Sequence, residues 1–526
     1  MKIAKWIGIV LVGLILVAVI LLKGFSFIIT KLPSFTGFPF SSHNYLVLFQ
    51  NNYELRPTGG FISTYGVLKF RHGIFWGIDF GDVYGDVADH PYVEPPKAMG
   101  QLLADKDYKG YTFRDTNFDP DFTVAKDEII KFYNINHPEI KIDGVIAADF
   151  TALENLVALY EPLKIDDYEF TKQNLFESLS SIVSDIDRHD EETLAGRKNI
   201  ASSIVKKVIT RTVLLPWRVR AASDVMLQAF DEKHMLASFN QSGLQKAFAK
   251  RGWDGSLPNG DAGDYLAVNN ANYGGMKSNR YLEQDVIYEL NVMPNHSVEA
   301  KVTVNLAHYG NWNVPLSGKY KGYLRIFYPG GMQEQILGIE PGDTVSYTYS
   351  YVLPESVWAD GVYNLRLVKQ PGTLANRYRV VVRVPSGESV KGEDFVIKEN
   401  VALYDTNLLS DQNLSFELVP DTNPPRVIAH DLISLNQIEI EFNESLSAAL
   451  TSNLFNYEVI DLDKKNSNKT DSLKVSEVRV EGSKVIITTT GMTVQPTERY
   501  QVLLKNVQDL KGNTIVPNLR KLTVVQ

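Results

Sequence analysis

The chain opens with an apolar run that water cannot accommodate. Residues 6–22 read WIGIVLVGLILVAVILL and contain no charged side chain, with Lys2 and Lys5 before them and Lys23 after. As a helix this run would span about 25 Å, close to the thickness of a bilayer's hydrocarbon core. No small-x-small cleavage site follows, so we predict that residues 1–30 form an uncleaved signal anchor, a single N-terminal transmembrane helix. The basic flank predicts a cytoplasmic N-terminus and an extracytoplasmic bulk at the cell membrane.

Cysteine usage and net charge restrict the chemistry further. The 526 residues include no cysteine, which excludes disulfides, cysteine nucleophiles and thiolate metal sites. The formal net charge of −9 argues against nucleic acid as a partner. Apolar residues make up 44% of the chain, enough to bury cores in several domains. The apolar run 6–22 makes the lipid bilayer the first partner that the sequence predicts.

Residues 44–270 mix the two hydrophobic periods. Strand-like runs occur at 45–50, 61–70, 73–80 and 142–150, and helix-like runs at 121–135, 152–160, 172–186 and 191–215. The runs 61–70 and 73–80 are joined by Arg71, His72 and Gly73, which predicts an antiparallel hairpin. Strands that alternate with helices around a hairpin indicate an α/β sandwich domain with a mixed sheet.

The second half of the chain has the pattern of β-structure. Residues 281–385 alternate tyrosine and valine with polar residues and carry PGG and EPGD turns, which indicates an all-β sandwich. Residues 386–421 are polar and weakly patterned, and we interpret them as a linker. The motif DTNPP then opens a second all-β unit, 422–526. The predicted fold is thus an α/β domain followed by two all-β sandwich domains.

Several motifs resemble known bacterial families. The segments YLVLFQNNYELRPTGGFISTYG, FRDTNFDPDF, IDGVIAADFTALENL, NNANYGGMKSN, YLRIFYP and VKQPGT resemble, in that order, the bacterial envelope family called domain of unknown function 4012, over about residues 44–385. The tail, with IEIEFNESL, VRVEGSKVIITTTG and NVQDLKGNTI, is similar to the Ig-like domains of bacterial surface layers. The tail resemblance implies an Ig-like fold only.

A more distant similarity suggests a reaction. The order of strand, arginine-bearing turn, strand, acidic turn and basic helix is similar to that of the LytR-CpsA-Psr family, which transfers glycopolymers from polyprenyl-pyrophosphate carriers. That resemblance implies that Arg56 and Arg197 lie near family arginines that hold the pyrophosphate, and that Asp82, a candidate catalytic residue, lies near the family turn with an arginine followed by an aspartate. The family turn carries an arginine, whereas this chain reads DVYGD there. One phosphate ligand of the family is therefore missing.

The turn NNYELRPTGGF, residues 51–61, fits two interpretations. Gly59 and Gly60 permit close backbone approach, and the Arg56 guanidinium offers a planar fork suited to phosphate or carboxylate. The turn can therefore bind an anionic ligand. Alternatively, Arg56 pairs with Glu54 or another carboxylate of the protein, as structural ion pairs commonly do.

Charge is segregated along the α/β region. Residues 72–96 hold five acids and no Lys or Arg, whereas residues 197–220 hold seven basic residues and no acid. Asp82 and Asp86 are therefore candidate metal ligands, and Mg²⁺ is the metal that such carboxylates would hold beside a phosphate. The alternative is an acidic loop and a basic helix that both face solvent. The sequence itself identifies no cofactor.

Two further segments supply candidates for the site. On a helical projection Arg197 points into the apolar stripe of Ile204 and Val208, while Lys206 points the opposite way. An inward arginine needs an anion, either an internal carboxylate such as Asp115 or a ligand. The motif FRDTNFDPDF adds further charged side chains. Its Asp121 is predicted to cap the next helix; Arg114 is a candidate ligand-binding residue and Asp115 a candidate catalytic one.

Two classes of function follow from these residues. The first is an extracytoplasmic envelope protein that binds or transfers an anionic lipid-linked or cell-wall glycan, with Mg²⁺-assisted phosphoglycosyl transfer as its reaction if it is an enzyme. The second is a non-catalytic surface-display or adhesion protein with Ig-like modules. Convergence of Arg56, Arg114, Arg197 and the acidic turn on one cleft with an apolar floor would favour the first class.

Overall fold

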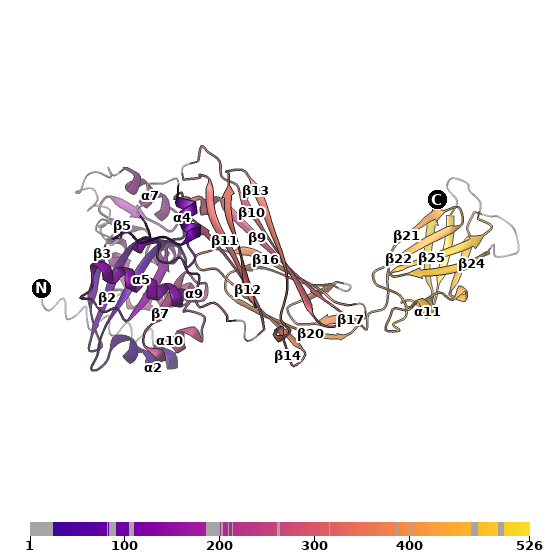
Figure 1. The fold of residues 1–526 in the computed structure, drawn as a ribbon, viewed down its shortest axis with the longest axis horizontal. Coiled ribbons are helices and arrows are strands. Elements are labelled where there is room, and N and C mark those ends of the chain that lie inside the picture. The colour runs from indigo at the N-terminus through magenta and orange to yellow at the C-terminus, as the bar shows by residue number, and fades with distance from the viewer. Residues whose placement is uncertain are drawn as a thin grey trace.

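The computed structural model describes the chain between residues 25 and 525 with several gaps. The described residues are 25–81, 83, 91–104, 110–185, 200, 203–208, 210–212, 214–259, 263–314, 316–385, 387–398, 401–463, 472–492 and 499–525. Within these ranges no helix is both long and apolar enough to cross a membrane. The predicted anchor run, 6–22, lies outside the described residues. Three folded units follow one another along the longest axis of the molecule (Figure 1).

The first unit is an α/β domain built on a mixed sheet, as predicted. The five-stranded sheet has the order β3-β2-β1-β4-β7, and only the β1–β4 pair is parallel. Its strands are β1 (Ser42–Asn51), β2 (Phe61–Arg71), β3 (Ile74–Gly81), β4 (Gly144–Asp149) and β7 (Met235–Phe239). The predicted hairpin is confirmed: His72 and Gly73 connect β2 to β3, both with positive φ.

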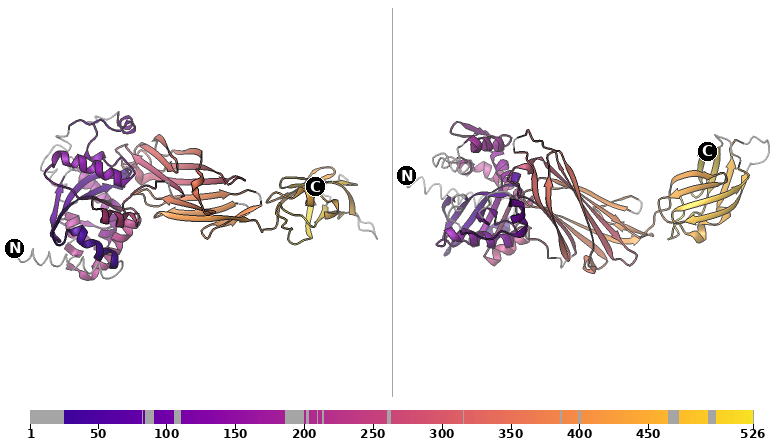
Figure 2. Two further views of the ribbon diagram at one scale, coloured as in Figure 1. Left: turned by 60° about the horizontal axis from the view of Figure 1, so that its bottom comes forward. Right: turned by 45° about the horizontal axis from the view of Figure 1, so that its top comes forward.

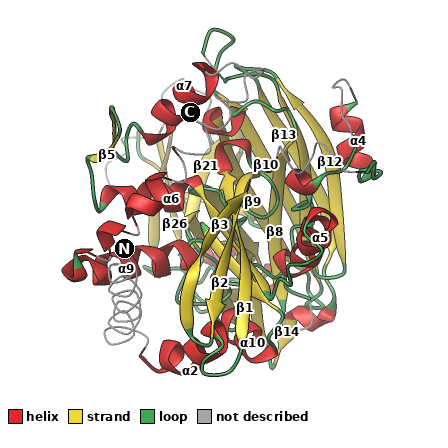
Figure 3. Ribbon diagram, turned by 90° about the vertical axis from the view of Figure 1, so that its left-hand side faces the viewer, coloured by secondary structure: helices red, strands yellow, loops and turns green. Residues whose placement is uncertain are grey.

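Helices cover both faces of this sheet (Figure 3). On one face α4 (Lys97–Leu103) and α5 (Phe122–Asn136) pack on β1 and β2, and on the other α2 (Phe25–Thr36), α9 (Val219–Asp231) and α10 (Ser242–Ala249) enclose an aromatic core around Tyr45. The Asp121 carboxylate accepts a hydrogen bond from Thr123 N at 2.8 Å, which confirms the predicted N-cap of α5.

A small helical lobe sits beside this sheet. It comprises α6 (Phe150–Ala158), β5 (Leu163–Ile165), β6 (Tyr168–Phe170), α7 (Leu175–Asp185) and the helical residues 203–208 and 210–212. Ile204 and Val208 are buried in its core, whereas Lys206 is exposed and lies 5.6 Å from the centre of the Phe80 ring. The predicted apolar stripe is therefore confirmed for these described residues.

The second unit consists of two sheets packed face to face. One has the order β13-β10-β9-β16-β19-β18, and the other β12-β11-β8-β15-β20-β17 with β14 beside β15. The strands are β8 (Asp264–Asn272), β9 (Leu282–Val292), β10 (Val298–His308), β11 (Tyr320–Tyr328), β12 (Gly331–Ile339), β13 (Thr344–Val352), β14 (Trp358–Ala359), β15 (Val362–Val368), β16 (Asn376–Arg383), β17 (Glu388–Lys391), β18 (Val396–Lys398), β19 (Val401–Leu408) and β20 (Gln412–Pro420). Alternating side chains of both sheets meet in one core.

Two predicted boundaries are wrong. The α/β domain was expected to extend to residue 270, but β8 lies inside the sandwich, hydrogen-bonded to β11 and β15. The segment 386–421 was expected to be a linker, but it contains β17 to β20, and β19 pairs along its whole length with β16. Several positions of β19 and β20 are only half-buried, so the alternation between buried and exposed residues is irregular. For this reason the sequence pattern did not identify these strands.

The third unit is a seven-stranded β-structure at the C-terminal end (Figure 2). Its order is β21-β22-β25-β24-β23-β26-β27, and a single core fills it. The elements are β21 (Val427–Ser434), β22 (Gln437–Phe442), α11 (Ala448–Thr451), β23 (Tyr457–Asp461), β24 (Ser472–Glu481), β25 (Lys484–Thr490), β26 (Arg499–Leu504) and β27 (Arg520–Val525). This unit lies within the predicted range 422–526.

Candidate functional site: an arginine-centred domain interface

The turn after β1 lies where the α/β domain meets the first sandwich. The Asn51 side chain accepts a hydrogen bond from Tyr53 N at 3.1 Å and so caps the short 3-10 helix Asn52–Glu54. Gly60 must lack a side chain, because a Cβ there would lie 2.4 Å from the Asn51 carbonyl carbon. The glycines therefore serve a close approach between protein backbones.

Backbone groups of this turn are bonded to the sandwich. Leu55 O accepts a hydrogen bond from Asn272 N at 2.8 Å, and Leu55 N donates to Asn279 Oδ1 at 3.0 Å. Pro57 O accepts from Asn269 Nδ2 at 3.1 Å. The partners Asn269, Asn272 and Asn279 all belong to the NNANYGGMKSN segment. Two motifs of the family resemblance therefore contact each other.

A third motif closes against the same turn. Asn52 Nδ2 donates to Gly372 O at 3.0 Å, within the VKQPGT segment. A Cβ on Gly372 would lie 1.9 Å from Gly59 O, and Gly372 has a φ of +80°. Only glycine fits here, because both the left-handed backbone and the contact exclude a side chain.

Arg56 is buried in the middle of this interface, with 3% of its surface exposed. Its Nη2 lies 3.4 Å from Glu54 Oε1 and 3.5 Å from Asp115 Oδ1. The guanidinium carbon lies 4.4 Å from the ring centre of Tyr273, a sandwich residue, and 5.4 Å from that of Phe61. Its Nε and Nη1 have no hydrogen-bond partner among the described residues. Arg56 is thus held by two carboxylates and two rings.

Asp115 joins Arg56 to Arg114. It is 2% exposed, and its Oδ2 lies 3.3 Å from both Arg114 Nε and Thr112 Oγ1. The neighbouring Asn117 donates from Nδ2 to Gly60 O at 2.8 Å. The structure therefore brings together three of the predicted site residues in one ion-pair network, in which Arg56 and Asp115 are buried and Arg114 is partly exposed.

Arg325 on β11 is a second buried arginine that the sequence reasoning did not select. Its Nη2 donates to Phe118 O at 2.8 Å, and its guanidinium carbon lies 4.9 Å from the ring centres of Phe118 and Tyr323. Burial lowers the pKa of Arg325 and raises that of the Tyr273 phenol to about 12. A charged residue at the centre of the apolar run YLRIFYP is the signal that could have identified it.

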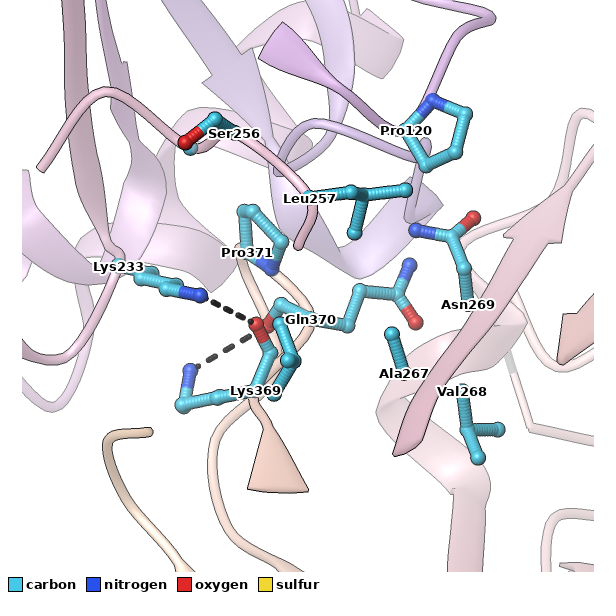
Figure 4. A pocket seen from close by; sticks show the side chains of 12 residues that line it. Pro120, Lys233, Ser256, Leu257, Ala267, Val268, Asn269, Lys369, Gln370 and Pro371 are labelled. Carbon is cyan, nitrogen blue, oxygen red and sulfur yellow. Dashed lines mark hydrogen bonds between the residues drawn. The ribbon is translucent and has the colours of Figure 1, made fainter. Parts of the chain in front are cut away.

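Two buried lysines, Lys233 of the α/β domain and Lys369 of the sandwich, also lie at the interface. Lys233 Nζ lies 2.6 Å from Asp411 Oδ1, and Lys369 Nζ donates to Thr373 O at 2.6 Å. Burial lowers the pKa of Lys369 to about 7. Both lysines line a small pocket with Asn269 (Figure 4), whose volume of about 10 Å³ has room for roughly one water molecule. A pocket of this size cannot hold a glycan.

The remaining predicted site residues fall in other parts of the chain. Asp82 and Asp86, the predicted metal ligands, and Arg197 lie outside the described residues. Their roles, and that of Mg²⁺, stay predictions. The Glu94 carboxylate, at the end of the acidic run, accepts a hydrogen bond from Tyr92 Oη at 2.9 Å.

Three carboxylates gather at the junction between the second and third units. Oxygens of Asp421, Glu444 and Asp509 lie within 4.8 Å of one another. Burial and the two neighbouring aspartates raise the pKa of Glu444 to about 7. Asp509 is buried and accepts hydrogen bonds from Lys511 N and Asn513 N at 2.8 and 2.9 Å. The Asp509 carboxylate therefore also orders the loop that contains it.

The site joins an α/β domain to a β-sandwich through the buried arginines Arg56 and Arg325. Known proteins resemble parts of this chain. Residues 41–183 match the family described as "Protein of unknown function (DUF4012)". No curated protein matches the chain. One solved structure, described as the N-terminal part of the bacterial S-layer protein SbsC, aligns at 15% identity and a TM-score of 0.17, covering 20% of this chain and 23% of its own. That likeness carries no structural argument.

Proposed function

We propose that this protein is a membrane-anchored, extracytoplasmic envelope protein without catalytic activity. In this proposal the α/β domain and the first sandwich form one rigid arm. The arm holds the C-terminal unit, which we interpret as Ig-like, away from the bilayer. The third unit lies at the opposite end of the molecule from β2 and β3 (Figure 1).

One observation supports the proposal: Arg56, the anion-binding candidate of the turn after β1, is buried inside the domain interface. Arg56 is almost fully buried and faces Glu54, Asp115 and the Tyr273 ring. The hydrophobic core of the α/β domain continues through this contact to Ala271, Tyr273 and Tyr323 of the sandwich. An interface with a shared apolar core resists relative domain motion.

The anchor and the orientation of the chain rest on the N-terminal sequence. The apolar run 6–22, with Lys2 and Lys5 before it, supports a single span and a cytoplasmic N-terminus. The described helix α2 begins at Phe25, directly after this segment. The folded units would then all lie on the extracytoplasmic side.

Single-cysteine labelling tests this topology, since the chain has no native cysteine. Glu477 is exposed on β24 of the third unit. We expect Glu477→Cys to react with a membrane-impermeant maleimide on intact spheroplasts. Lys2→Cys should react only after permeabilisation. Labelling of Lys2→Cys on intact spheroplasts, with Glu477→Cys protected, would overturn the proposed orientation.

The rival proposal is that the α/β domain binds or transfers an anionic lipid-linked glycan, with Mg²⁺ at Asp82 and Asp86. It would require the interface around Arg56 to open, because only 3% of the Arg56 surface is exposed. A polyprenyl-pyrophosphate analogue with Mg²⁺ should therefore leave the melting temperature of the full chain unchanged. A clear ligand-dependent rise would favour the rival, since a ligand that binds the folded state stabilises it.

A further inference from the structure

One corner of the α/β domain exposes large apolar side chains. Phe38 is 63% exposed, Phe40 87%, Ile74 40% and Trp76 69%. They come from the loop after α2 and from the start of the edge strand β3. We call these four side chains the aromatic corner. Exposed apolar patches on folded proteins commonly mark an interaction surface.

The aromatic corner is held in shape by backbone hydrogen bonds. Gly73 N donates to Thr36 O at 3.1 Å, and His72 N donates to Ser41 O at 2.8 Å. The Phe38 ring lies against Gly73, where a Cβ would be only 2.7 Å from a ring carbon. The loop and the hairpin therefore form one preorganised surface.

The strand pattern separates the corner from the core. On β3 the side chain of Phe75 packs against Phe70 at 5.9 Å between ring centres, inside the sheet's aromatic core. Ile74 pairs with Arg71 and alternates with Phe75, so it points to the other face. Trp76 lies at a register shift between β2 and β3, where it has no paired residue on β2. Both side chains are exposed on an edge strand, a feature that soluble proteins normally avoid.

The position of the corner in the chain identifies what covers it. The apolar run ends at residue 22, and α2 leads from Phe25 to Thr36, next to Phe38. Twelve helical residues span about 18 Å, so the corner cannot lie far from the end of a membrane span. Figure 3 shows α2 beside the ends of β1 and β2.

The chemistry of the corner suits the bilayer interface. Aromatic side chains are enriched at the level of the lipid headgroups, and apolar side chains enter the boundary between headgroups and acyl chains. Lys23, Lys31, Arg71 and His72 flank the corner in sequence, and cationic groups favour anionic lipids. Asp79, the acid on β3, is paired with Lys69.

We propose that the aromatic corner inserts into the headgroup region of the same bilayer that holds the N-terminal anchor, and so fixes the tilt of the arm. This inference rests on the proposed membrane anchoring. The corner's occupant is the lipid surface, and a protein partner is the alternative that the experiment must separate from it.

The test uses the full chain with one introduced cysteine that carries an environment-sensitive fluorophore. Phe40→Cys reports on the corner. Phe455→Cys is the matched control, because Phe455 is 82% exposed in the third unit. The chain is reconstituted into vesicles of phosphatidylcholine and phosphatidylglycerol, with and without acyl-brominated phosphatidylcholine. We expect a blue-shifted emission at Phe40→Cys and several-fold stronger quenching by brominated lipid than at Phe455→Cys.

The outcomes separate the corner from the anchor. Equal, weak quenching at both positions in protein that floats with the vesicles would overturn the corner proposal and leave the anchor intact. Protein that does not float would overturn the anchor proposal, and the corner proposal with it. A blue shift at Phe40→Cys that depends on protein concentration and is insensitive to brominated lipid would overturn the lipid assignment and assign the corner to a second copy of the chain.

Discussion

Replacing Arg56 with methionine should destabilise the arm. Methionine has a similar length and removes the charge, so the buried Asp115 loses one of its two arginine partners. Removing one member of a buried ion pair costs about 3–5 kcal/mol. The lower end applies here, because both Arg56 contacts are long, at 3.4 and 3.5 Å, and Arg114 remains. We therefore expect a loss of about 3 kcal/mol in the free energy of unfolding.

Urea denaturation of the full chain, followed by far-ultraviolet circular dichroism, measures this loss. The control is Arg379→Met, because Arg379 pairs with Asp405 on an exposed sheet face, where such pairs contribute about 0–1 kcal/mol. An Arg56→Met variant that is as stable as the parent chain, and that loses affinity for a pyrophosphate ligand, would refute the structural role of Arg56.

Three further predictions concern glycine geometry and pH. Gly372→Ala should lower the free energy of unfolding several-fold more than Gly361→Ala. Gly361 has a similar φ, but a Cβ there would meet no atom within 4 Å. Gly361→Ala therefore measures only backbone strain, about 1–2 kcal/mol. Glu444 has a pKa raised to about 7, so the folded state retains a proton that the unfolded state loses. Stability of the third unit should fall as pH rises from about 4.5 to about 7, and Glu444→Gln should remove that slope in urea titrations. Lys369 has a pKa lowered to about 7, so the unfolded state binds more protons above that pH. Stability of the arm should rise between about pH 7 and 10, and Lys369→Met should abolish the rise.

Local periodicity was sufficient to predict much of the α/β domain. The apolar spacing of α5 and the aspartate before it predicted both the helix and its cap, and the turn His72–Gly73 predicted the β2–β3 hairpin. These features depend on residues close together in sequence, which is why they could be derived without the tertiary structure.

The sandwich boundaries could not be derived in the same way. The strand β8 is buried on nearly every residue, so it has no alternation, and its partners β11 and β15 come later in the chain. A strand buried on both faces does not reveal its sheet from its own sequence.

The role of Arg56 also depended on distant residues. The sequence left open an anionic ligand or an internal carboxylate such as Glu54. The structure places Arg56 beside Glu54 and Asp115 and against the Tyr273 ring, which belongs to another domain. Arg325 was missed for the same reason, because its partner Phe118 lies in the α/β domain.

Rigidity of the arm is the central claim, and the distance between its two domains tests it most directly. Spin labels at Glu139→Cys, after α5, and Glu355→Cys, in the sandwich, occupy exposed positions in a chain without native cysteine. Pulsed electron paramagnetic resonance on the full chain should give one narrow distance distribution. Addition of a polyprenyl-pyrophosphate analogue and Mg²⁺ should leave it unchanged. A broad distribution, or a shift of its maximum on ligand addition, would contradict the account and indicate a domain interface that opens to bind.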